Sequence, residues 1–241
     1  MSTEDVWVTF DLDGTIFENR LRRYMMPGLE RVVLARGRRR VRLKHPRPGA
    51  HRLRSRLSAP WLRAIRAVAR RSLPPRTHLY PDVVPALHAL REMGYRLAAV
   101  TNGYRVYQEP LLEGLGILDL FDRFISPETV GVAKPDPRMW TNGVRDGRVA
   151  LHVGDRLTDD VIGAHHAGIP AVWLVRVKPR GRRALRLQAR LVAYAKPECT
   201  TTNLWGVVEH LRALSEKEAA ETQESEDAGP PCETDGTQGS L

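Results

Sequence analysis

Two carboxylates, Asp11 and Asp13, follow a short apolar stretch near the start of the chain. Residues 6–10 are apolar or β-branched, which predicts a buried strand of a parallel sheet. Side chains two residues apart in an extended chain lie on the same side, so both acids can face one point. Carboxylates so placed can hold a hard cation, attack an electrophile or transfer a proton. An ordinary Asp-Gly turn, with Gly14 next, would contain the same residues.

Polar residues follow two further apolar stretches in the same way. Thr101-Asn-Gly103 comes after residues 95–100, and Gly154-Asp155 comes after residues 149–153. Ligands of open parallel sheets bind beyond the carboxyl ends of the strands. The three polar segments should therefore meet at one edge of a sheet, a coincidence that an isolated turn does not predict.

Helices and strands are expected to alternate from Asp82 onward. The first helix should have Asp82 as its N-cap and end at Gly94, and Pro110 should interrupt a helix that ends near Gly116. The other expected elements are strands at 95–100, 122–125, 149–153 and 171–175, and helices at 159–167 and 204–214. This alternation predicts an α/β fold with a doubly wound parallel sheet.

The chain of 241 residues is 42% hydrophobic, enough for one core and a modest second domain. We expect a core from residues 1–17 and 79–215, an Arg-rich helical insertion at 18–78 and a disordered acidic tail at 216–241. No apolar stretch is long enough to span a membrane. The two cysteines, Cys199 and Cys232, form no disulfide or zinc pattern, which favours a reduced, cytoplasmic protein.

The net charge of +10 is unevenly distributed. Residues 18–78 contain 18 arginines and one lysine against two glutamates, a net +17, and Arg63, Arg66 and Arg70 share one face of a helix expected at 59–70. After Ser215, eight acidic residues accompany one lysine. The basic segment could draw anionic ligands to a site, or it could bind nucleic acid or an anionic surface.

Four segments in this order resemble the motifs of the haloacid dehalogenase superfamily, most of whose members are phosphatases. They are Asp11-Leu-Asp-Gly-Thr15, Thr101-Asn-Gly103, Lys134-Pro-Asp-Pro137 and Gly154-Asp-Arg-Leu-Thr-Asp-Asp-Val161. The resemblance implies a Rossmann-like core, and residues 18–78 fall where one subgroup carries a small helical cap. A helix that family members usually have between Lys134 and Gly154 looks shortened here, to 138–144.

The resemblance also implies a role for each motif residue. Asp11 would attack phosphorus to form an aspartyl-phosphate, and Asp13 would be the general acid and base. Thr101 and the Asn102 backbone would bind the phosphoryl oxygens, and Lys134 would offset negative charge. The Mg²⁺ ligands would be Asp11, the backbone carbonyl of Asp13, Asp155 and a further acid. The register favours Asp160 for that acid, with Asp159 capping its helix instead.

Asp13 separates two reactions within the superfamily, because dehalogenating members lack this second acid and the metal. We therefore expect an Mg²⁺-dependent phosphatase acting on a small phosphorylated metabolite such as a nucleotide, a sugar phosphate or a phosphoglycolate-like acid. The alternative is a nucleic-acid or anionic-surface binding protein that uses residues 18–78. Three histidines, His152, His165 and His166, are expected to be structural or solvated. The sequence defines neither the natural substrate nor the oligomeric state.

Overall fold

The computed structural model describes residues 5–18, 63–64, 66–67, 70–71, 78–176 and 182–227. Most of the expected insertion at 18–78 and the last part of the expected tail therefore lie outside the described residues. Within residues 63–71, every described residue is helical, in agreement with the helix expected there.

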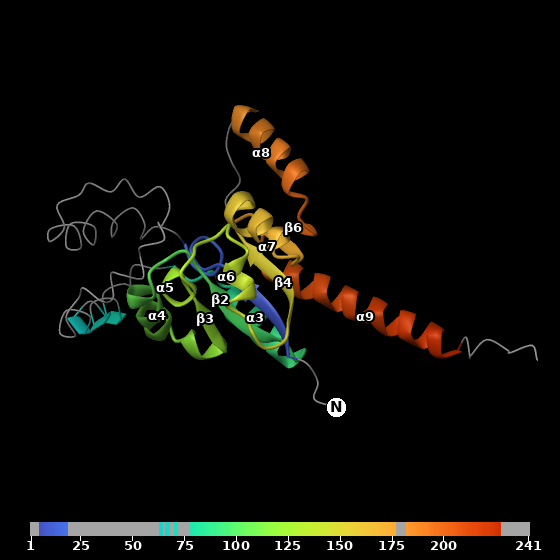
Figure 1. The fold of residues 1–241 in the computed structure, drawn as a ribbon, viewed down its shortest axis with the longest axis horizontal. Helices are drawn as coiled ribbons and strands as arrows, with labels where there is room; N and C mark the ends of the chain where they lie inside the picture. The colour runs from blue at the N-terminus through green and yellow to red at the C-terminus, as the bar shows by residue number, and fades with distance from the viewer. Residues whose placement is uncertain are drawn as a thin grey trace, which may run out of the picture.

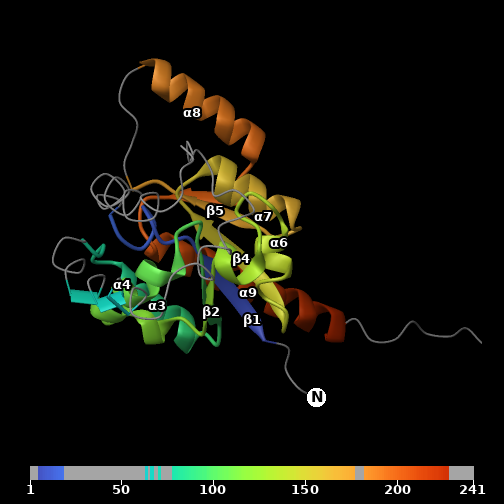
Figure 2. The same ribbon diagram turned by 60° about the vertical axis from the view of Figure 1, so that its left-hand side comes forward.

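The described residues form a six-stranded sheet in which every neighbouring pair of strands is parallel. The strand order is β3-β2-β1-β4-β5-β6, which is a doubly wound topology and confirms the predicted fold class. The central strand β1 lies between β2 and β4 (Figure 2). The strands are β1 Val6–Phe10, β2 Arg96–Val100, β3 Arg123–Ile125, β4 Arg148–Gly154, β5 Ala171–Leu174 and β6 Cys199–Thr201.

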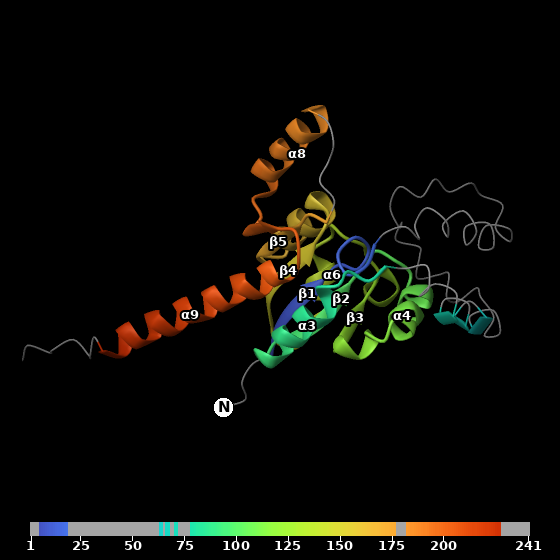
Figure 3. The same cartoon turned by 180° about the vertical axis from the view of Figure 1, so that it is seen from behind.

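Helices cover both faces of the sheet, and alternate strand residues pack into two separate cores. Val8 and Phe10 pack into one core and Trp7 into the other, as the two-residue period of a strand requires. The first core lies under α3 Val83–Glu92, α4 Arg105–Gly114 and α9 Trp205–Asp227, and Figure 3 shows α3 across this face. The second lies under α5 Pro127–Val130, α6 Arg138–Thr141, a π-helical turn Leu157–Val161, α7 Ile162–His166 and α8 Arg182–Ala195.

The structure differs from the sequence prediction around two of the helices. A break was expected at Pro110, but α4 continues through it. Pro110 costs the helix one backbone hydrogen bond, and the burial of Pro110, Leu111 and Leu112 in the core offsets that loss. Asp82 precedes α3, but its side chain makes no cap bond and instead accepts hydrogen bonds from Arg176 and the Leu204 backbone.

The C-terminal part of the chain contains more structure than the sequence suggested. α8 and the edge strand β6 were not predicted, and α9 extends to Asp227, whereas disorder was expected from residue 216. Figure 1 shows α8 and α9 extending from the sheet in different directions. No helix in the described part of the chain is long and apolar enough to cross a membrane.

The two ends of the insertion lie side by side. The Glu18 N–H donates to the His78 carbonyl at 2.8 Å, and the Tyr80 N–H donates to the Ile16 carbonyl at 3.3 Å. Arg176 anchors this junction through two hydrogen bonds to the Thr15 carbonyl and a contact of its guanidinium with the Tyr80 ring. The core thus holds residues 16–18 next to residues 78–80.

Candidate active site

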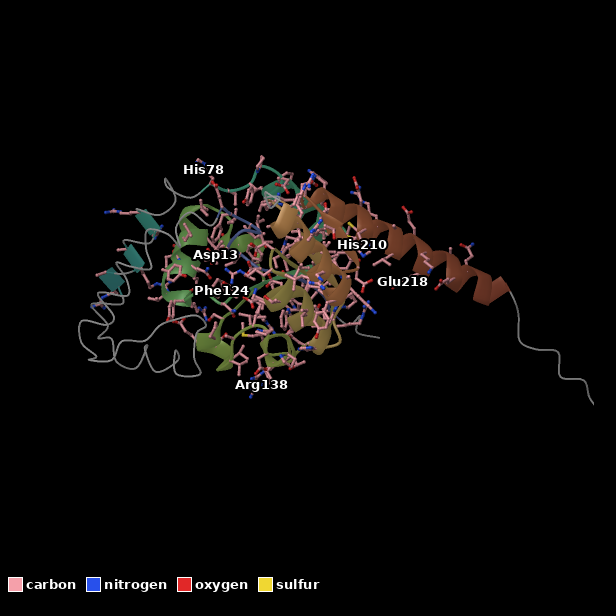
Figure 4. All side chains as sticks on the ribbon, turned by 90° about the horizontal axis from the view of Figure 1, so that it is seen from above. Asp13, His78, Phe124, Arg138, His210 and Glu218 are labelled. Carbon is pink, nitrogen blue, oxygen red and sulfur yellow. The ribbon has the colours of Figure 1, made fainter. Side chains whose placement is uncertain are left out.

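Three adjacent strands bring the predicted residues to one edge of the sheet. Asp11 follows β1, Thr101 follows β2 and Asp155 follows β4. The backbone N–H of Asp11 donates to the Val153 carbonyl of β4 at 2.9 Å, which fixes its position relative to that strand. In Figure 4, Asp13 lies on the side of the core opposite to the part of α9 that carries Glu218. The predicted meeting of the motifs at a single edge is therefore what the fold produces.

The Lys134 ammonium lies at the centre of the site. Its Nζ donates to Asp11 Oδ1 at 2.6 Å, to Asp160 Oδ1 at 2.6 Å and to the Val100 carbonyl at 2.8 Å, so all three donors are used. Burial opposes the charge, but the carboxylates of Asp11 and Asp160 outweigh it and raise the pKa of Lys134 above its ordinary value. Lys134 is therefore a fixed positive charge beside Asp11.

Asn102 holds the backbone of Lys134 with both ends of its side-chain amide. Its Oδ1 accepts from the Lys134 N–H at 2.7 Å, and its Nδ2 donates to the Lys134 carbonyl at 3.0 Å. The helix after Lys134 is only one turn long, as the shortened segment suggested. The two hydrogen bonds of Asn102 thus tie the Lys134 backbone to the segment that follows β2.

Asp11, Asp155 and Asp160 form a compact acidic cluster, in which one carboxylate oxygen from each lies within 4.8 Å of the others. Gly14 makes this approach possible, because its φ is +90° and a Cβ there would overlap the Asp155 carboxylate. Asp155 Oδ1 is buried and has no hydrogen-bond partner among the described residues. The three carboxylates, one of which has a buried oxygen without a hydrogen-bond donor, form a ligand set that suits a hard divalent cation.

The pKa values of the three acids also favour a cation in the cluster. Burial, together with neighbouring acids, raises the pKa of Asp11 to about 7 and that of Asp155 to about 9. Burial would also raise the pKa of Asp160, but Lys134 and His152 hold it below its ordinary value. A cation among these oxygens would remove the repulsion and favour the charged carboxylates.

The two candidate acids in the last motif have different surroundings. Asp160 is fully buried, and its Oδ2 accepts from the Arg156 N–H at 2.9 Å while its Oδ1 contacts Lys134. Asp159 instead pairs with the Arg156 guanidinium at 3.0 Å. Only Asp160 of the two belongs to the acidic cluster.

Asp13 is half-buried and stands apart from the cluster. Its Oδ2 accepts from Gln108 Nε2 at 2.7 Å. Burial raises the pKa of Asp13 to about 6, although Arg156 and Lys134 oppose that rise. A carboxyl group that titrates near neutral pH can both donate and accept a proton, as a general acid and base must.

Thr101 is buried, and its Oγ1 accepts from the Gly103 N–H at 2.9 Å. Sequence reasoning did not identify Gln108, and it did not foresee that the Asn102 side chain would hold Lys134. A polar residue on the buried face of an amphipathic helix, three and four positions before Leu111 and Leu112, is the signal that could have identified Gln108.

The three histidines differ in their surroundings: His152 lies beside the acidic cluster, with Nε2 3.5 Å from Asp160 Oδ1, whereas His165 is half-buried and His166 is exposed. His152 is fully buried, with Nδ1 2.8 Å from Thr9 Oγ1 and its ring edge-on to Trp140. His165 and His166 belong to α7, and among the described residues the one cluster with metal-ligand geometry is that of the three aspartates.

Residues 7–168, more than half of the chain, match the family model of haloacid dehalogenase-like hydrolases. The chain belongs to this family. Over 103 residues it is 44% identical to a glyceraldehyde 3-phosphate phosphatase of Methanopyrus kandleri, a match that covers 41% of this chain and 44% of that protein. The match thus spans less than half the length of that relative.

Solved structures of the same fold include a HAD phosphatase from Thermococcus onnurineus, with 26% identity, a TM-score of 0.56 and coverage of 85% of this chain and 97% of the other. A 2-haloacid dehalogenase from Pseudomonas syringae has 25% identity, a TM-score of 0.54 and coverage of 88% and 100%. The fold is therefore common to enzymes named for two different reactions, and the site residues must distinguish them.

Proposed function

We propose that this protein is an Mg²⁺-dependent phosphatase that hydrolyses a small phosphorylated metabolite through a phosphorylated Asp11. The observation that carries the proposal is the second acid, Asp13, which comes two residues after Asp11 and lies outside the acidic cluster, where it accepts a hydrogen bond from Gln108. A phosphate ester has a poor leaving group that must be protonated, whereas a halide needs no proton. Asp13 therefore favours phosphoryl transfer over dehalogenation.

In the proposed reaction, the Asp11 carboxylate attacks phosphorus while the bond from phosphorus to the alcohol oxygen breaks. The proton of Asp13 passes to that oxygen, and the alcohol leaves. The Asp13 carboxylate then takes a proton from water as the water oxygen bonds to phosphorus, which releases phosphate and regenerates Asp11. In this proposal the positive charge of Lys134 and the Thr101 hydroxyl would counter the charge on the phosphoryl oxygens.

The residues proposed to hold Mg²⁺ are Asp11, the backbone carbonyl of Asp13, Asp155 and Asp160. When bound, the ion would reduce the repulsion between the anionic phosphate and the Asp11 carboxylate. Lys134 already neutralises part of the charge on Asp11 and Asp160, so one divalent cation is sufficient to balance the cluster.

The family and the relative support the proposed substrate class. A small phosphate ester such as a phosphorylated aldehyde, acid or sugar is the first choice, because the Methanopyrus kandleri relative is named a glyceraldehyde 3-phosphate phosphatase, and a nucleotide is the second. A cytoplasmic location is part of the same proposal, and Cys199 is a free thiol.

The nucleic-acid alternative gains no support from the described residues, because Arg66 and Arg70 lie 3.2 Å from Glu109 and Glu113 of α4.

The test is a panel of phosphorylated metabolites assayed with Mg²⁺ and with EDTA. We expect hydrolysis only with Mg²⁺, and we expect Asp11→Asn to lower kcat by a factor of at least about 10³, because both the nucleophile and a metal ligand are lost. Asp119→Asn, the same change at an exposed position, is the control. Activity of Asp11→Asn within about tenfold of wild type, or about 1.4 kcal/mol of barrier, would exclude Asp11 as the nucleophile.

A further inference from the structure

Gln108 is a fully buried polar side chain on α4, a helix that none of the four motifs includes. Its amide reaches the active site, where Nε2 donates to Asp13 Oδ2 at 2.7 Å. Its Oε1 is also buried and has no hydrogen-bond partner in the described part of the chain. A buried amide is costly unless it is bonded, so a half-satisfied one beside an acid calls for an explanation.

The glycine of the Thr-Asn-Gly segment makes room for this amide. A Cβ on Gly103 would overlap the carboxamide carbon, nitrogen and oxygen of Gln108. The Gly103 N–H is itself held by Thr101 Oγ1, which fixes the backbone on that side. The Gln108 amide is thus confined between the Gly103 backbone and the Asp13 carboxyl group.

The contact makes the two oxygens of Asp13 chemically different. Oδ2 accepts an N–H from Gln108, and an oxygen that accepts such a bond is the less favourable place for a proton. Oδ1 receives no such bond from Gln108, so it is the better proton carrier. The amide also restricts rotation of the carboxyl group, which keeps Oδ1 in one direction.

We propose that Gln108 is the positioning residue of the general acid and base, holding Asp13 by Oδ2 so that Oδ1 gives and takes the proton. This inference rests on the proposed phosphatase function. In the first step the proton leaves Oδ1 for the oxygen of the departing alcohol, and in the second Oδ1 takes a proton from the attacking water. Gln108 contacts neither phosphorus nor the nucleophile and acts only through Asp13.

The test compares two substrates that differ in their need for a proton. Gln108→Met keeps the length of the side chain and removes the hydrogen bond. We expect it to lower kcat for an alkyl phosphate from the metabolite panel by about tenfold or more, since general acid catalysis contributes about 10²–10⁴-fold. For p-nitrophenyl phosphate, whose leaving group needs no proton, we expect a change below about threefold in the phosphorylation step, which pre-steady-state measurement of p-nitrophenol release isolates.

Two controls separate positioning from a general loss of structure. Gln188→Met makes the same change on α8, away from the site, and should alter neither substrate. In an Asp13→Asn background, Gln108→Met should have little further effect, because a residue that acts through Asp13 has nothing left to position. Should Gln108→Met not fold, Gln108→Leu also lacks the donor, adds no charge beside Asp13 and should show the same difference between substrates.

The outcomes distinguish this inference from the proposed function. Equal losses for both substrates, or an undiminished effect in the Asp13→Asn background, would overturn the positioning role while leaving the phosphatase assignment intact. An inactive wild-type enzyme on every phosphate ester, with and without Mg²⁺, would overturn the proposed function and this inference with it.

Discussion

The proposed function makes Asp13 the acid that distinguishes phosphoryl transfer from dehalogenation, so its replacement is the most informative change at the residue scale. Asp13→Asn keeps the shape and the contact with Gln108 but cannot transfer a proton. We expect kcat for alkyl phosphates to fall by about 10²–10⁴-fold. With p-nitrophenyl phosphate, p-nitrophenol should appear as a burst, followed by slow hydrolysis of the phosphorylated enzyme. Full steady-state activity with alkyl phosphates would contradict the role of Asp13.

The titration of the acidic cluster gives a second prediction at this scale. In EDTA, Asp155 has a folded-state pKa of about 9 against an ordinary value of 3.8, so between pH 7 and 9 the folded protein must lose a proton that the unfolded chain has already lost. The free energy of unfolding should therefore fall as the pH rises through this range. The lowered pKa of the buried His152 has its effect below its ordinary value of 6.5, outside this range.

Thermal unfolding at pH 7, 8 and 9 checks this prediction. We expect Tm to fall with pH in EDTA and to fall less with Mg²⁺, so that the stabilisation by Mg²⁺ grows with pH. Asp155→Asn should flatten the EDTA curve. A Tm that rises from pH 7 to 9 in EDTA would show that Asp155 is already ionised in the metal-free fold.

At the scale of the elements, α4 connects the active site with the helical residues of the 63–71 segment. Gln108 faces Asp13, while Glu109 pairs with Arg66 and Glu113 pairs with Arg70. Exposed ion pairs of this kind contribute about 0–1 kcal/mol each to the free energy of unfolding. They therefore affect the position of these helical residues against α4 more than the stability of the fold.

A charge swap tests whether the Arg70–Glu113 pair orients that helix. Arg70→Glu and Glu113→Arg, each alone, should lower kcat/KM several-fold at low salt with Tm nearly unchanged, because each places like charges side by side. The double variant should recover most of the loss, and the effect should shrink as salt is added. Equal kcat/KM values for all four proteins would mean that the pair has no part in catalysis.

The helices and strands also differ in how well they could be predicted from the sequence. The strands β1, β2 and β4 are apolar runs that end in polar motifs, and strands were also expected at 122–125 and 171–175, where β3 and β5 lie. Local signals thus placed five of the six strands of the described sheet and the site edge correctly. The edge strand β6 has three residues, too few for a periodic signal. α8 was not predicted, and the path of α4 through Pro110 depends on packing against residues elsewhere in the chain. The Gln108–Asp13 contact joins residues 95 positions apart, which local pattern cannot reveal.

At the scale of the whole molecule, α9 consists of two parts with different energetic roles. Leu204, Val207, Val208 and Leu211 are buried in the first core at the start of the helix, whereas residues 212–221 are exposed. Four buried apolar side chains contribute about 1.5–3 kcal/mol each, a large share of the roughly 5–15 kcal/mol that stabilises a typical domain.

Two truncations test this division. The Tm of a chain ending at Ser215 should lie within about 2 °C of that of the full protein, because the side chains of residues 216–221 that it loses are exposed. A chain ending at Asn203 should be largely unfolded at 25 °C. A large fall in Tm for the chain that ends at Ser215 would show that the acidic residues after Ser215 dock on the rest of the molecule.

The backbone bonds between Glu18 and His78 and between Ile16 and Tyr80 have a consequence for how such a protein can diversify. A segment whose two ends emerge next to each other can be exchanged, lengthened or removed at little cost to the rest of the chain, since loop closure entropy grows only slowly with length. The core and its catalytic edge can then be inherited unchanged while the segment at 18–78 is replaced. Changes in that segment need not alter the strands that carry the acidic cluster.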